Sequence, residues 1–162
     1  GPAIMTELEP GAVQMAIIRA ESSFIFNARP PRTRLMGVIH WKRPSNAYGF
    51  AQALDDTWLW YLKDTGRDYA SRDEFEDAID FVGWYTNKSN KIAGISKWDP
   101  YNQYLAYHEG QTGWRKKTFE KKPWLKQKAQ QVDRHAQEWW GQLQHCQADL
   151  DNRWWLLRRL LS

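Results

Sequence analysis

The apolar residues of this chain are spaced as in helices along most of its length. Val13, Ala16, Ile17 and Ala20 follow Pro10-Gly11 in steps of three and four, which predicts a helix ending near Ser22. Similar spacings predict further helices over about 51–64, from Ser71 past Tyr85, from Asp99 to Gly110, from Pro123 to about Cys146, and over a last stretch from Leu150 to Leu161.

Local signals predict where several of these helices begin and end. Ser71 and Glu74 have the spacing of a capping box, and Asp99 followed by Pro100 predicts an N-cap with proline in the first turn. Gly66 is expected to stop the second helix. No run alternates apolar and polar residues convincingly, so the predicted fold class is all-α or nearly so.

One long segment breaks the helical pattern. From Asn27 to Asn46 the chain is rich in proline and arginine and has no helical period, which predicts an irregular loop. Any sheet is expected to be a small hairpin within it, around Leu35 to Trp41. A loop of this length inside a compact domain is usually functional.

Composition narrows the function without deciding it. The 162 residues suit one domain, and the formal net charge of +4 favours polyanionic partners such as nucleic acid, acidic lipid or a bacterial wall, with solubility alone as the other reading. The single cysteine, Cys146, excludes an intrachain disulfide and does not point to a metal site. The chain has eleven tryptophans. Most are expected to fill the core, where each buries a large area, and two or three are expected to contact a ligand.

Three short segments carry candidate chemistry, in a fixed order. Glu21-Ser22 closes the first predicted helix, Gly49-Phe50-Ala51-Gln52 opens the second, and Ala106-Tyr107-His108-Glu109-Gly110 ends the fourth. Ile17, Ile18 and Phe24 surround Glu21 with apolar side chains, which would raise the pKa of its carboxyl group. Spacing alone also allows Glu21 to be a surface residue that pairs with Arg19 or a loop arginine.

Together the three segments resemble the catalytic domain of soluble lytic transglycosylases, over roughly residues 11 to 115. The resemblance implies a lysozyme-like helical fold that cuts peptidoglycan glycan strands. It implies that Glu21 is the one catalytic acid and base, that Tyr107 orients it, and that substrate-binding groups come from Ser22, Tyr48, Gly49, Phe50, Gln52, Tyr107 and His108. The product would be a 1,6-anhydro sugar formed without water.

The chain also departs from the family pattern. The loop from Ser23 to Tyr48 is longer than the family's connection, and Phe50 and Ala51 replace a leucine and a methionine. His108 replaces an asparagine, and it can either hydrogen-bond a sugar or pack on the Tyr101-Tyr104 face. Trp41 and Tyr48 are expected on the rim of the cleft.

Two other function classes stay open on sequence grounds. A goose-type muramidase would need a second acid, for which Asp55, Asp56 and Glu109 are the candidates. A non-catalytic module that binds peptidoglycan or serves as a scaffold would need only the basic, aromatic surface. Product analysis separates the muramidase from the transglycosylase, because hydrolysis leaves a reducing end and transglycosylation an anhydro end.

The remaining expectations concern organisation and partners. We expect a single domain over 1–162, with a catalytic region over 3–115 and C-terminal helices over 123–162. We expect peptidoglycan as partner, no nucleic acid, no metal, no cofactor and a monomer. The expected location is the periplasm or the outer membrane of a bacterium, with any signal or lipid anchor lying outside this sequence.

Overall fold

A computed structural model describes the backbone of residues 2–29, 34–35, 39–40 and 46–160, and the side chains of residues 11–29, 46–153, 156, 158 and 159. Most of the described chain is helical. The elements in order are α1 (Pro2–Ser22), β1 (Arg34–Leu35), β2 (Ile39–His40), α2 (Asp55–Thr65), α3 (Phe75–Ala93), α4 (Pro100–Arg115), the 3-10 helix η1 (Thr118–Lys121) and α5 (Pro123–Leu160).

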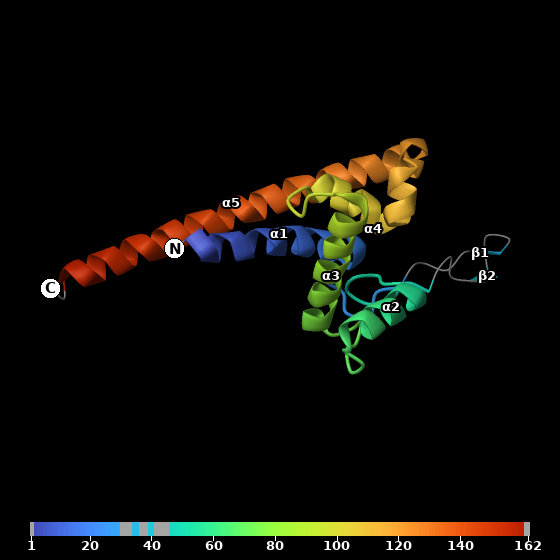
Figure 1. Ribbon diagram of the computed structural model, residues 1–162, viewed down its shortest axis with the longest axis horizontal. Coiled ribbons are helices and arrows are strands. Elements are labelled where there is room, and N and C mark those ends of the chain that lie inside the picture. Colours follow the sequence, from blue (N-terminus) through green and yellow to red (C-terminus); the bar gives the residue numbers. More distant parts are fainter. Residues whose placement is uncertain (1, 30–33, 36–38, 41–45, 161–162) are drawn as a thin grey trace.

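The longest two helices lie side by side and run in opposite directions, and α3 and α4 pack against them (Figure 1). The core lies where α1, α3, α4 and the first half of α5 meet. Its largest fully buried side chains are Tyr61, Tyr104, Phe81, Ile17, Ile18, Leu105 and Leu125. The apolar faces predicted for the first, third and fifth helices all contribute to this core, so the predicted helical fold class is confirmed.

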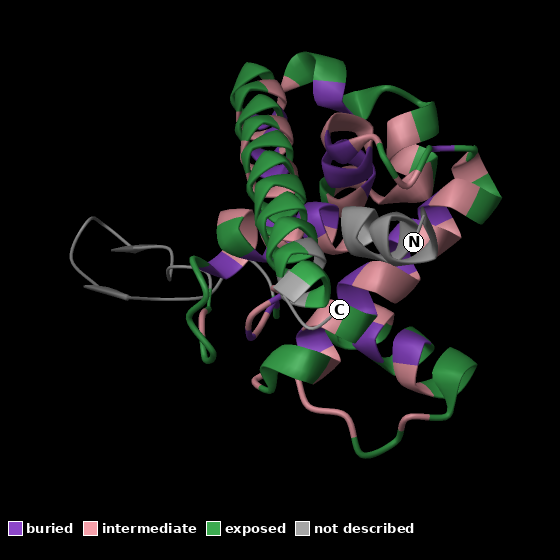
Figure 2. Ribbon diagram, turned by 90° about the vertical axis from the view of Figure 1, so that its left-hand side faces the viewer, coloured by how far each residue is buried: buried purple, intermediate pink, exposed green. Residues whose placement is uncertain are grey.

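The C-terminal helical region differs from the prediction. Residues 123–160 form one continuous helix rather than two, because neither proline nor a glycine in a left-handed conformation interrupts it. Leu150 and Leu156 of the predicted last helix are exposed. Figure 2 shows that the described part of α5 toward the C-terminus is largely exposed. The side chains of Trp154, Leu157 and Leu161 lie outside the described residues.

The predicted helix boundaries were correct at some positions and wrong at others; the fourth helix begins after Asp99 as predicted, but it continues past Gly110 to Arg115. The first helix ends at Ser22 as predicted, but it already includes Pro10-Gly11 and begins at Pro2. The second begins at Asp55 rather than near Ala51, and ends as predicted at Gly66, which has a φ of 69°. Glycine has no Cβ and adopts this left-handed conformation at little cost.

The two predicted N-caps had opposite outcomes. Asp99 caps α4 by accepting a hydrogen bond from Asn102 N at 3.0 Å, as predicted. The capping box at Ser71 is wrong. The hydroxyl of Ser71 donates instead to Asp73 Oδ1, and its backbone nitrogen donates to Asp77 Oδ2 at 2.9 Å, so α3 begins only after Glu74.

The long connection between α1 and α2 contains the predicted hairpin. Strands β1 and β2 are antiparallel, with Arg34 opposite His40 and Leu35 opposite Ile39. Trp41, which was expected on the rim of a cleft, lies outside the described residues. Among the helices in the described part of the chain, none combines the length and the apolar character needed to cross a membrane.

Candidate active site

The chain turns sharply directly after Glu21-Ser22. Ser23 and Phe24 have φ values of 51° and 64°, a left-handed conformation that is costly for residues other than glycine. Ser22 is buried, and its hydroxyl donates to Ile18 O at 3.2 Å within its own helix. The helix therefore stops with the side chain of Glu21 at its end, while Ser22 faces inward instead of toward a ligand.

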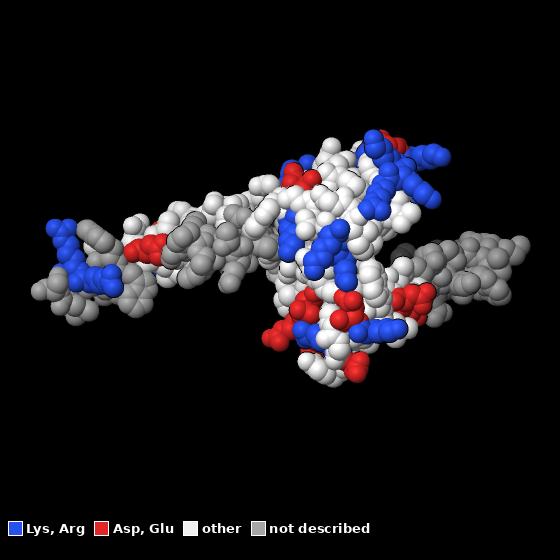
Figure 3. Space-filling view, viewed as in Figure 1, with Lys and Arg blue, Asp and Glu red and all other residues white. Residues whose placement is uncertain are grey.

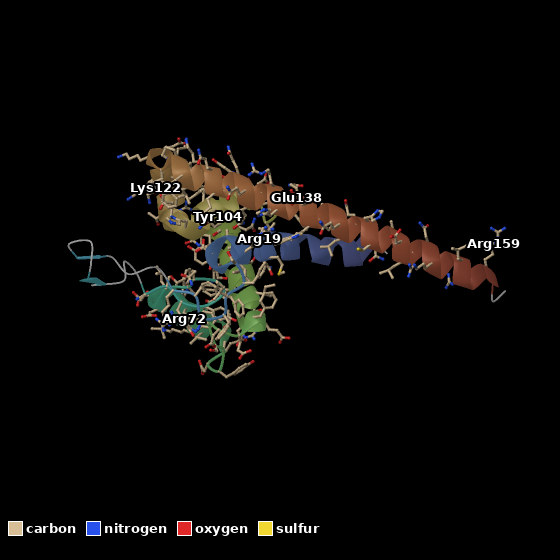
Figure 4. The ribbon with its side chains drawn as sticks, turned by 180° about the vertical axis from the view of Figure 1, so that it is seen from behind. Arg19, Arg72, Tyr104, Lys122, Glu138 and Arg159 are labelled. Carbon is tan, nitrogen blue, oxygen red and sulfur yellow. The ribbon has the colours of Figure 1, made fainter. Side chains whose placement is uncertain are left out.

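The carboxyl group of Glu21 is held by a tyrosine from α4. The hydroxyl of Tyr104 donates to Glu21 Oε1 at 2.7 Å, and the tyrosine itself is fully buried. Burial raises the pKa of Glu21 above its ordinary value, and the attraction of Lys128, the hydrogen bond from Tyr104 and the attraction of His108 oppose this rise. Figure 4 shows Tyr104 beneath α5, close to the end of α1 that Arg19 marks.

The second segment forms a tight turn that only glycine allows. Gly49 has a φ of 83°, and a Cβ placed there would lie 2.0 Å from the carbonyl oxygen of Arg72. Gln52 N donates to Gly49 O at 3.2 Å, and Tyr48 pairs with Ala53 across the turn. The glycine is thus required both by its dihedral angle and by the close approach of the segment before α3.

This turn is bound to the segment that follows Glu21. The carbonyl oxygen of Ala28 accepts hydrogen bonds from Gly49 N at 3.0 Å and from Gln52 Nε2 at 2.7 Å. Gln52 Nε2 also donates to Gly49 O at 2.9 Å. The amide nitrogen of Gln52 therefore holds the turn in place rather than pointing its hydrogens toward a ligand.

A second tyrosine of α4 completes the constellation. The hydroxyl of Tyr107 donates to Ala51 O at 2.5 Å and packs against Tyr85, with ring centroids 5.1 Å apart. Tyr104 and Tyr107 are one turn apart and so share a helix face. Tyr104 binds the first segment and Tyr107 the second, so α4 brings all three segments together.

The structure changes the role expected for Tyr107. A phenol has one hydrogen to donate, and that of Tyr107 goes to Ala51 O, so the hydroxyl that holds Glu21 is that of Tyr104. Sequence reasoning missed Tyr104 as a site residue. Its position three residues before Tyr107 on the same predicted helix was the available signal.

A cleft of about 240 Å³ lies between the second and third segments. One wall comes from the turn and the start of α2, the other from α4, and Phe81 and Tyr85 of α3 lie between them. The lining residues are Gln52, Ala53, Leu54, Thr57, Phe81, Tyr85, Tyr107, His108, Glu109 and Gly110. A concave site with a few polar groups on an apolar floor is the usual form of a ligand site.

The whole chain was then compared with known proteins. The family model described as "Transglycosylase SLT domain" matches residues 8–146, which include all three segments. The chain belongs to this transglycosylase family. Searches of curated proteins and of solved structures gave no match.

Membership of the SLT family accounts for the architecture. The helical fold is lysozyme-like, as the resemblance implied, and the family's substrate is the peptidoglycan of the cell wall. The match ends within α5, so it includes the part of this helix that packs on α1 and α4. The resemblance seen in the sequence covered only residues 11 to 115.

The other predicted site residues of this transglycosylase domain lie around the same centre. Phe50 packs edge-on against Phe75, with ring centroids 5.5 Å apart. Tyr48 donates its hydroxyl to Asp73 Oδ2 at 3.1 Å, and the Arg29 guanidinium lies 4.4 Å from its ring centroid. His108 is exposed and its ring packs edge-on against Trp124 at 5.3 Å, so it does not pack on the Tyr101-Tyr104 face.

The third segment ends in a kink. Gly110 has φ 76° and ψ 162°, a conformation that is essentially restricted to glycine. The helical conformation of α4 continues after it to Arg115. Glu109, just before the kink, is nearly buried and binds Lys122 Nζ at 2.8 Å and Thr118 Oγ1 at 3.1 Å. Burial would raise the pKa of Glu109, but the hydrogen bonds from Lys122, Thr118 and His108 outweigh it, and its pKa is lowered.

Among the described residues, no group of three or more histidine, cysteine, aspartate or glutamate side chains is placed to hold a metal ion. A carboxylic acid with a raised pKa, fixed by the hydroxyl of a tyrosine, is suited to give a proton to a leaving group and take one back.

Proposed function

We propose that this chain is a lytic transglycosylase that cleaves the β-1,4 bond between N-acetylmuramic acid and N-acetylglucosamine and forms 1,6-anhydro-N-acetylmuramic acid. One observation carries the proposal: Glu21 has a raised pKa and is held by Tyr104 where all three family segments meet. A neutral carboxylic acid at working pH is what protonation of a glycosidic oxygen requires.

In the proposed reaction, protonated Glu21 gives its proton to the glycosidic oxygen as the bond to the muramyl anomeric carbon breaks. The 2-acetamido oxygen of the same sugar stabilises the positive charge that develops. The resulting Glu21 carboxylate then takes the proton from the muramyl C6 hydroxyl, whose oxygen attacks the anomeric carbon. Glu21 ends protonated, and no water is consumed.

The cleft walls would receive the glycan strand. Phe81 and Tyr85 lie buried behind the cleft and support its floor, and the exposed His108 offers a ring nitrogen to a ligand. Tyr107 and Gln52 line the same cleft, and their hydrogen bonds to Ala51 O and Ala28 O keep its wall rigid. We assign both residues to shaping the site, and His108 to contacting substrate.

The carboxylates near the site favour transglycosylation over hydrolysis. A muramidase needs a second carboxylate that is available to activate water. Glu109 is bound to Lys122, and Asp55 is bound to Arg72 Nη1 at 2.7 Å. Both therefore have cationic partners, and Asp56 is exposed in the first turn of α2.

Digestion of purified peptidoglycan sacculi tests the proposal. Mass spectrometry of the released fragments should show anhydro ends, lower by one water than the reducing ends that hydrolysis leaves. Reducing ends would establish a muramidase. Binding to sacculi without released fragments would establish a non-catalytic wall-binding module. We propose that the reaction takes place in the periplasm or at the outer membrane.

A further inference from the structure

Under the proposed function, Glu21 has to be stable in two charge states. It begins as a neutral acid, becomes a carboxylate when it has given its proton away, and returns to the neutral form. The burial that keeps the acid protonated also makes the carboxylate costly, because an apolar environment disfavours a charge. The site therefore needs a group that stabilises the carboxylate.

Several ionisable groups face Glu21 from the elements packed against α1. Helix α4 contributes Tyr104, Tyr107 and His108, and α5 contributes Lys128. Burial raises the pKa of Tyr107 well above the ordinary value, and burial raises that of Tyr85 on α3 to about 12, so both are neutral. Among the groups that favour the Glu21 carboxylate, Lys128 acts most strongly, ahead of Tyr104 and His108.

The position of Lys128 explains this effect. Its ammonium lies 5.9 Å from the ring centroid of Tyr104, the residue whose hydroxyl binds Glu21 Oε1. A cation at this distance from an aromatic face is attracted to it. Lys128 therefore affects Glu21 in two ways: through its positive charge, and through its contact with the ring of Tyr104, whose hydroxyl holds the carboxyl group.

Two other lysines near the start of α5 are already paired. Lys122 binds Glu109 at 2.8 Å, and Lys126 binds Glu120 at 3.0 Å. Lys128, by contrast, forms no salt bridge within the described part of the chain. Its charge is thus available to a carboxylate that appears only during the reaction.

We propose that Lys128 is a further positioning residue of this site, which steadies the Tyr104 ring and stabilises the carboxylate form of Glu21 between the two proton transfers. Lys128 neither gives nor takes a proton. The inference rests on the proposed function, because it assigns Lys128 a part in that reaction. Arg19 of α1 is not a substitute, since its guanidinium lies against the Trp139 ring.

The first test is the pH profile of turnover in the Lys128→Met variant. Without the cation the acid form of Glu21 persists to higher pH, so the high-pH limb of kcat/KM should move to higher pH. At the optimum, kcat should fall about threefold, because a weaker acid gives up its proton more slowly. Lys128→Arg keeps the charge and should restore both properties.

Lys126→Met is the matched control. It makes the same change two residues earlier on α5 and removes a surface pair with Glu120, so the pH profile should stay that of the wild type. If Lys128→Met folds, as judged by circular dichroism, and its high-pH limb does not move, the inference is wrong. Should the methionine variant fail to fold, Lys128→Gln keeps a polar end and gives the same comparison.

A measurement that needs no activity separates this inference from the proposed function. With ¹³C-labelled glutamate, nuclear magnetic resonance follows the titration of the Glu21 carboxyl carbon, which the Glu21→Gln variant identifies. The Glu21 titration should move to higher pH in Lys128→Met and stay in place in Lys126→Met. A wild-type protein that leaves sacculi uncut overturns the proposed function, whereas an unmoved Glu21 titration overturns only the role of Lys128.

Discussion

Two glutamates near the cleft have opposite environments. Glu21 ends α1, where burial raises the pKa of its carboxyl group and a neutral phenol donates a hydrogen bond to it. Glu109 precedes the kink of α4, where an ammonium and a hydroxyl bind it directly and its pKa is lowered. Around this second region lysines gather over the end of α4, η1 and the start of α5 (Figure 3).

The difference shows that burial alone does not decide whether the pKa of a carboxyl group is raised or lowered. The side chain of Glu109 is only 7% exposed, yet it is stabilised as a carboxylate, because Lys122 supplies a full positive charge at hydrogen-bond distance. Lys128 acts on Glu21 from farther away, over the ring of Tyr104. A cation in direct contact therefore lowers the pKa of a buried carboxyl group, whereas a more distant one leaves the effect of burial dominant.

The largest expected effect is on turnover. Glu21→Gln should lower the release of fragments from sacculi by on the order of 10²–10⁴-fold, since the amide cannot give a proton. The matched change Glu109→Gln should lower it by no more than about threefold, because Glu109 makes no proton transfer in the proposed reaction. Equal losses in the two folded variants would instead point to a muramidase with Glu109 as its second acid.

Removing the cation near Glu109 should make the second glutamate resemble the first. In Lys122→Met the carboxyl group stays buried without its partner, so the pKa of Glu109 should rise. We expect a loss of about 1–2 kcal/mol in the free energy of unfolding, less than for a fully buried pair because 37% of the Lys122 side chain is exposed. Urea denaturation measures this loss.

The control is again Lys126→Met. It breaks an exposed pair with Glu120 and should change the free energy of unfolding by less than about 0.5 kcal/mol. A loss in Lys126→Met as large as that in Lys122→Met would mean that burial of Glu109 does not set the strength of its ion pair.

Replacing each tyrosine by phenylalanine should separate their roles. Tyr104→Phe removes the hydrogen bond to Glu21, so the pKa of Glu21 should rise and turnover should fall about tenfold. Tyr107→Phe removes the donor to Ala51 O and should lower the free energy of unfolding by about 1 kcal/mol, leaving the titration of Glu21 in place. A Glu21 titration that moves in Tyr107→Phe and not in Tyr104→Phe would restore the role first expected for Tyr107.

The smallest effect is a difference in how stability depends on pH. A carboxyl group with a raised native pKa lowers stability as pH rises from the ordinary pKa of glutamate through the native one. Glu21→Gln should therefore stabilise the protein at pH values above the native pKa of Glu21, where the wild type carries a buried charge. Glu109 has a lowered native pKa, so its contribution is complete above the ordinary pKa and is lost as pH falls through the native one.

Thermal unfolding at neutral pH and at pH 3 checks these signs. At neutral pH the Tm of Glu21→Gln should exceed that of the wild type, and the Tm of Glu109→Gln should lie below it. At pH 3 the difference for Glu21→Gln should vanish and that for Glu109→Gln should shrink. A Glu21→Gln variant that is less stable at neutral pH would show that the buried carboxyl group is not a cost to the fold.

Much of the fold could be predicted from local patterns. Helical spacing, the Asp99 N-cap and the Gly66 stop depend on residues within one or two turns, and the structure agrees with them. The split of α5 was an error that the sequence could have prevented, since no proline follows Pro123. The capping box at Ser71 failed because Asp73 and Asp77, two and six residues further along the chain, take up the groups that the box would have used.

The sequence by itself determined the helical class, the order of the three segments and the family they indicate. Apolar spacing and short motifs are local properties, and these conclusions needed nothing more. Only the tertiary structure decided that Tyr104 rather than Tyr107 binds Glu21 and that Lys122 neutralises Glu109. Tyr104 and Glu21 are 83 positions apart, and a hydrogen bond over that separation exists only once α1, α4 and α5 have packed together.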